Sequence, residues 1–118
     1  MTAAPMSRAH RAYVIAMCAV IGGAFAYAAC DWGRWPHLTY HPLTGAWALG
    51  STSPLAVHYP GLVAWGLGGA CAGALVGAVA CALAPRPWPA QLYRLLGAWA
   101  LTAIALAGGY FTWTLWPW

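Results

Sequence analysis

The stretch GLVAWGLGGACAGALVGAVACALA, residues 61–84, decides the fold of this 118-residue chain. It contains no Asp, Glu, Lys, Arg or His and consists largely of Ala, Gly, Leu and Val. As an α-helix, about 24 residues extend about 36 Å, whereas the hydrocarbon core of a bilayer is about 30 Å thick. The stretch therefore predicts a membrane-crossing helix over about 60–84.

Glycines recur at every fourth position along one face of this predicted helix. A neighbouring helix can approach such a face closely, because no side chains separate the two backbones. The small residues with this spacing are Gly69, Gly73, Gly77 and Cys81 here, Gly22 and Ala26 earlier, and Ala105 and Gly109 later. We predict that they form helix-packing interfaces, either with another subunit or a second copy, or among the helices of one chain.

Two further apolar runs flank the deciding stretch. The first predicts a helix over about 12–30, and the second predicts a helix over about 91–114. Between the later two helices, the Pro-rich segment 85–90 predicts a short turn, since proline cannot continue a helix. The chain is therefore expected to be a single all-α membrane domain with three transmembrane helices.

Two processing signals compete with a retained helix as interpretations of the first apolar run. A basic stretch followed by an apolar one and by Ala-Tyr-Ala-Ala at 26–29 also resembles a signal peptide. Cys30 after two alanines resembles a lipoprotein cleavage site, although Tyr27 fits that pattern poorly. We expect the helix to be retained.

Residues 31–59 form an outer segment of different composition, rich in Pro, Gly, Trp, Tyr and His. The segment shows no sustained helical period, and its aromatic residues are typical of the belt at lipid-headgroup depth. Those residues are Trp32, Trp35, Tyr40, Trp47 and Tyr59. The segment is expected to lie along the membrane surface.

Composition and charge support a membrane protein and indicate its orientation. Hydrophobic residues make up 63% of the chain and charged residues 5%, too few to cover a water-facing surface. Arg8, Arg11, Arg86 and Arg94 fall on one side of the predicted helices and Arg34 on the other. By the positive-inside rule, the N-terminus and the 85–90 turn are cytoplasmic, and segment 31–59 and the C-terminus lie outside. The net charge of +4 forms no nucleic-acid-binding patch, and the composition suggests a bacterial inner membrane.

Few residues could carry chemistry. No ionisable Asp, Glu, Lys, Arg or His falls in the centre of a predicted helix, where proton relays and ion-coupled transport sites would place one. His37, His41 and His58 could bind copper, zinc or a haem at the outer face, or could simply hydrogen-bond carbonyls at the aqueous interface. The four cysteines include no CxxC pair, and we predict no catalytic residue.

These observations favour a small non-catalytic transmembrane subunit of a larger inner-membrane complex, of respiratory, photosynthetic or membrane-oxygenase type. Its expected partners are membrane lipid, including bound lipid, and other membrane subunits or copies of itself. A homo-oligomeric channel or carrier is the alternative, with the glycines and Thr102, Thr112 and Thr114 lining its pore. A metal or haem site on the outer histidines is the second alternative.

Overall fold

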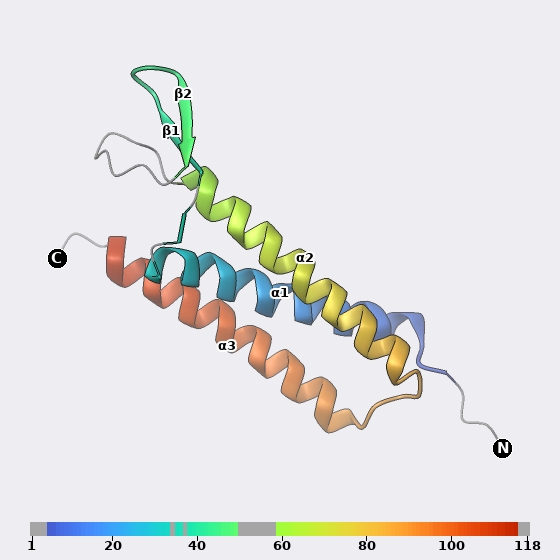
Figure 1. The fold of residues 1–118 in the computed structure, drawn as a ribbon. Coiled ribbons are helices and arrows are strands. Elements are labelled where there is room, and N and C mark those ends of the chain that lie inside the picture. The colour runs from blue at the N-terminus through green and yellow to red at the C-terminus, as the bar shows by residue number, and fades with distance from the viewer. Residues whose placement is uncertain (1–4, 34, 37, 50–58, 116–118) are drawn as a thin grey trace.

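The computed structural model of the chain describes residues 5–33, 35–36, 38–49 and 59–115. In chain order its elements are α1 (Arg8–Trp32), β1 (Leu38–His41), β2 (Ala46–Leu49), α2 (Tyr59–Leu83) and α3 (Ala90–Leu115), as Figure 1 shows. Three segments are long and apolar enough to cross a membrane, namely Arg8–Trp32, Pro60–Leu83 and Ala90–Thr114. The prediction of three helices able to span a membrane is confirmed.

Helix α1 begins one turn before the predicted residue 12. Ser7 is its N-cap, and the Ser7 hydroxyl accepts a hydrogen bond from the backbone N–H of His10 at 3.1 Å. Such a cap satisfies one of the free N–H groups of a helix start. The prediction followed hydropathy, which registers the apolar part of a helix and misses a polar first turn such as Arg8–Arg11.

The three long helices are arranged with α1 in the centre (Figure 1). Both α2 and α3 run beside α1, whereas the backbones of α2 and α3 do not lie against one another in the described part of the chain. Helix α2 runs antiparallel to α1, and α3 runs parallel to it (Figure 1). The 84–89 turn therefore connects two helices that each lie along α1, and each of them keeps one side open.

Segment 31–59 contains a β-hairpin, so the expectation of an all-α chain needs a correction. Strands β1 and β2 are antiparallel, with Leu38 opposite Leu49 and His41 opposite Ala46. The turn closes through hydrogen bonds from the backbone N–H groups of Thr44 and Gly45 to the carbonyl of His41. Gly45 has φ +66°, a conformation that glycine adopts without the steric cost of a side chain.

The hairpin is attached to the N-terminal end of α2. The indole N–H of Trp65 donates to the carbonyl of Pro36 at 2.8 Å, and the rings of Trp35 and Trp65 meet edge-on at 5.0 Å. Strand β1 also contacts α2, and Thr39 is fully buried with its hydroxyl donating to the carbonyl of Ala48. Aromatic contacts and hydrogen bonds thus give local order to a segment without helical periodicity.

At the opposite end, the residues preceding α1 pack against the turn between α2 and α3. The backbone N–H of Met6 donates to the carbonyl of Pro85 at 2.7 Å. Met6, Val14 and Cys81 form a buried cluster, against which Cys18, Trp88, Tyr93 and Leu96 pack. This cluster is where all three helices come together.

Candidate functional site

The glycine stripe, Gly69, Gly73 and Gly77, lies against α1 of the same chain. A Cβ added at Gly69 would collide with the carbonyl oxygen of Gly22 and with the Cβ of Ala26. One added at Gly73 would collide with the carbonyl of Cys18, and one at Gly77 would lie 3.0 Å from the Cα of Ile15. The absence of side chains on α2 therefore sets how closely the two backbones approach.

The predicted packing residues on α1 and at the end of α2 belong to the same interface. Gly22 faces Gly69 and Gly73, and Ala26 is buried beside Gly69. Cys81 is buried one turn beyond Gly77, against Met6. Six of the eight predicted packing residues are thus brought together between α1 and α2, within a single chain.

The remaining two, Ala105 and Gly109, lie on an exposed face of α3. A Cβ added at Gly109, or at the neighbouring Gly108, would meet no atom within 4 Å among the described residues, apart from the adjacent backbone of α3. Helix α3 turns other residues toward α1, among them Ala100, which is buried, and Ala103 and Ala107, which are half-buried. We name Ala105, Gly108 and Gly109 the open face of α3.

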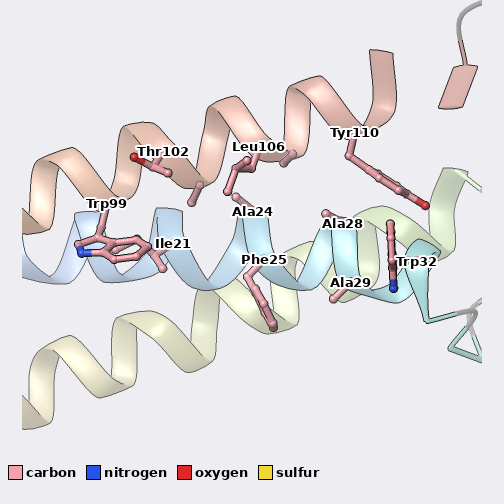
Figure 2. Close-up of a pocket in the computed structure, with 12 residues that line it drawn as sticks. Ile21, Ala24, Phe25, Ala28, Ala29, Trp32, Trp99, Thr102, Leu106 and Tyr110 are labelled. Carbon is pink, nitrogen blue, oxygen red and sulfur yellow. The ribbon is translucent and has the colours of Figure 1, made fainter. Parts of the chain in front are cut away.

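An apolar groove with a volume of about 460 Å³ runs between α1 and α3 (Figure 2). Trp99 lies toward one end, and Trp32 and Tyr110 lie at the other (Figure 2). Its lining comes from Ile21, Ala24, Phe25, Ala28, Ala29 and Trp32 on α1, and from Trp99, Thr102, Ala103, Leu106, Ala107 and Tyr110 on α3. Such a lining suits hydrocarbon and offers little to a polar ligand.

A polar contact closes one end of this groove. The phenolic O–H of Tyr110 donates to Oδ2 of Asp31, the only acidic residue in the chain, at 2.7 Å. The Tyr110 ring also packs against Trp32, with ring centroids 5.8 Å apart. A hydrogen bond to a carboxylate is stronger than one between neutral groups, so this contact ties the end of α1 to α3.

A second polar contact joins α1 and α3 near the other end. The hydroxyl of Tyr13 donates to the backbone carbonyl of Tyr93 at 2.9 Å. Gly97, one turn further along α3, makes room for it, since a Cβ there would collide with the Tyr13 hydroxyl. The His10 ring stacks on Tyr93 with centroids 4.7 Å apart. Sequence reasoning did not single out these residues, because no motif links positions so distant in the chain.

The structure places only one of the three histidines of segment 31–59. His37 and His58 lie outside the described residues, and His41 ends β1 in extended backbone. Across residues 5–33, 35–36, 38–49 and 59–115, no three His, Cys, Asp or Glu side chains are grouped as metal ligands. His37 and His41 are four residues apart, but His41 lies in a strand, where this separation does not correspond to one turn of a helix.

The three threonines that were assigned to a pore each donate a hydrogen bond to a carbonyl of their own helix. The hydroxyl of Thr102 donates to the carbonyl of Ala98, and that of Thr112 donates to the carbonyl of Gly108. The Thr114 hydroxyl donates to the carbonyl of Phe111 at 3.4 Å. The glycine stripe that was assigned to the same pore lies against α1 of the same chain.

The structure also gathers sulfur atoms that the sequence separates. Sγ of Cys81 lies 3.9 Å from Sδ of Met6, and Cys18 packs against the cluster that holds them. The sequence contains no CxxC pair, and Cys18 and Cys81 are 63 positions apart along the chain.

Comparisons with protein-family models, curated proteins and solved structures find no match to this chain.

Proposed function

We propose that this chain is a small non-catalytic transmembrane subunit of a larger complex in a bacterial inner membrane, of respiratory, photosynthetic or membrane-oxygenase type. It would act by packing its helices against a catalytic partner, with the hairpin segment covering that partner's periplasmic face. Lipid would fill the apolar groove between α1 and α3.

The observation that carries this proposal is the open face of α3. Ala105, Gly108 and Gly109 present backbone without bulk, and no atom of the described chain lies within 4 Å of a Cβ added at either glycine. Elsewhere in the same molecule, at Gly22 and Gly69, small residues mark the place where a second helix approaches closely. Helix association in lipid depends on such close packing, because lipid tails give no hydrophobic drive between helices.

The incomplete contacts among the three helices give independent support. Helices α2 and α3 each use one side to contact α1, and their backbones do not lie against one another in the described part of the chain. Their remaining sides carry exposed apolar residues such as Leu67 and Leu75 on α2 and Leu101 and Ile104 on α3. Such surfaces suit lipid or the helices of a partner.

The proposed orientation places the N-terminus in the cytoplasm. The hydrogen bond between Met6 and Pro85 brings the N-terminal segment and the 84–89 turn to one end of the molecule. Arg8, Arg11 and Arg86 therefore gather there, whereas the hairpin and Asp31 lie at the other end. A concentration of arginines on one side favours the cytoplasm for that side.

Purification from native membranes tests the proposal. A tagged copy of the full chain is solubilised in mild detergent and separated by size, and co-purifying proteins are identified and quantified. We expect a larger particle with one or more different membrane proteins at fixed stoichiometry. A monomer without a partner would overturn the proposal, and a particle made only of this chain would favour the homo-oligomeric alternative.

A further inference from the structure

The sulfur atoms of Met6 and Cys81 form a buried pair at the junction of all three helices. Sδ of Met6 and Sγ of Cys81 are 3.9 Å apart, and the two residues are 3% and 4% exposed. The contact does not depend on the long Met6 side chain alone, because the Met6 backbone is itself fixed by its hydrogen bond to Pro85. The pair is therefore a built feature of the fold.

A third sulfur atom, that of Cys18, approaches from α1. Cys18 packs against the cluster of Met6, Val14 and Cys81, and its Sγ lies 3.3 Å from the Cβ position of Gly77. Cys81 follows Gly77 by four residues, so both lie on the same face of α2. Helical side chains lean toward the N-terminus of their helix, which directs the Cys81 side chain back toward Gly77 and hence toward Cys18.

The chemistry of this donor set selects a class of metal. Thiolate and thioether sulfurs are soft ligands that favour Cu⁺, whereas structural zinc sites take four ligands from Cys, His and carboxylates. In a trigonal site with metal–sulfur bonds of about 2.3 Å, the sulfur atoms are about 4.0 Å apart. The observed 3.9 Å between Met6 and Cys81 matches that separation without rearrangement of the pair.

We propose that Met6, Cys18 and Cys81 form a binding site for the soft monovalent cation Cu⁺. On binding, both thiols release their protons and their sulfurs bond the metal as thiolates, while the Met6 thioether bonds as a neutral ligand. Two protons therefore leave for each Cu⁺ that binds, and the occupied site carries one net negative charge.

The chain supplies its own control for nonspecific binding of Cu⁺ to an accessible thiol. Cys71, also on α2, is a free and exposed cysteine away from the cluster. If Cu⁺ bound any accessible thiol, Cys71 would bind it at least as well as the buried pair. A preformed site predicts instead that the buried cysteines contribute to Cu⁺ affinity and that Cys71 does not.

Titration of the purified full chain with Cu⁺ tests the proposal. The reduced protein in detergent is titrated anaerobically against bicinchoninate, a competing Cu⁺ chelator. We expect one tightly held Cu⁺ per chain, with affinity weakened at least about tenfold in Cys18→Ala, Cys81→Ala and Met6→Leu and unchanged in Cys71→Ala. X-ray absorption of the loaded protein should show sulfur ligands only.

Two results would overturn the site. One is a wild-type chain that retains no Cu⁺ against the chelator, and the other is equal loss of binding in Cys71→Ala and Cys81→Ala. Met6→Leu conserves volume and hydrophobicity, so a folded Met6→Leu protein, verified by circular dichroism, keeps the test decisive if a cysteine variant fails to fold. Full Cu⁺ affinity in that variant would remove Met6 from the site.

Discussion

The backbones of Gly22 in α1 and Gly69 in α2 touch, and each occupies the space that a Cβ on the other would need. A Cβ at Gly22 would collide with the carbonyl oxygen of Gly69, and one at Gly69 with the carbonyl oxygen of Gly22. The neighbouring Gly68 has open space around its Cβ position. Gly68 therefore has room for a side chain, whereas the adjacent Gly69 does not.

Alanine should destabilise the chain at Gly69 but not at Gly68. We expect Gly69→Ala to destabilise the chain by about 1–3 kcal/mol, because the helices must separate to admit the methyl group. Gly68→Ala should be neutral or stabilise by up to about 1 kcal/mol, because alanine is the better helix former. Unfolding by SDS in mixed micelles measures both, and equal effects at the two positions would contradict the observed packing.

Tyr13 and Gly97 should behave as a coupled pair. Gly97→Ala displaces the Tyr13 hydroxyl from the Tyr93 carbonyl, whereas in a Tyr13→Phe background there is no hydroxyl to displace. We therefore expect Gly97→Ala to be more favourable in the Tyr13→Phe protein by about 1 kcal/mol, the value of one hydrogen bond. The same cycle with Gly108→Ala, which lies in open space, should be additive. Absence of coupling at Gly97 would argue against the bond.

The Asp31–Tyr110 bond should contribute measurably to the docking of α3 on α1. We expect Tyr110→Phe and Asp31→Ala each to destabilise the chain, and the double variant to lose less than their sum by about 1 kcal/mol. Tyr110→Phe keeps the ring contact with Trp32, so the cycle isolates the hydroxyl. The measurement is again SDS unfolding, and a coupling energy of zero would contradict a direct bond.

The hairpin should depend on the left-handed conformation of Gly45. Valine there would force a β-branched residue to φ +66°, at a cost of about 1–2 kcal/mol, whereas asparagine tolerates this region. We expect Gly45→Val to accelerate amide hydrogen exchange in β1 and β2 and Gly45→Asn to leave it nearly unchanged. Equal exchange in both variants would mean that the turn does not hold the strands.

Much of the fold could be predicted because lipid imposes a simple rule on sequence. Residues 61–84 are apolar without interruption, and a helix is the structure that satisfies its own backbone hydrogen bonds in hydrocarbon. The glycine spacing likewise predicts a close helix contact, but spacing alone does not say which helix makes it. In the structure Gly69 and Gly73 lie against α1, while Gly109, with a similar local sequence, lies open.

The rest could not be predicted because it depends on contacts between distant segments. The hairpin is held by Trp65 of α2 binding the carbonyl of Pro36, a contact that hydropathy and periodicity do not encode. The cluster of Met6 and Cys81 likewise requires the N-terminal segment to fold back onto Pro85. Taken one at a time in the sequence, these residues are typical of membrane interfaces or apolar segments and do not indicate the contacts that they make.

Photo-cross-linking at Ala105 in native membranes tests the subunit proposal most directly. A short diazirine side chain is placed at Ala105 on the open face of α3, and a second chain carries it at Ala103, which is half-buried on the side facing α1. After irradiation, we predict that the Ala105 chain is joined to a different membrane protein and that the Ala103 chain, whose probe faces the groove, reacts only within itself or with lipid in the groove. Adducts at Ala105 with lipid alone, or only with a second copy of this chain, would contradict the proposal.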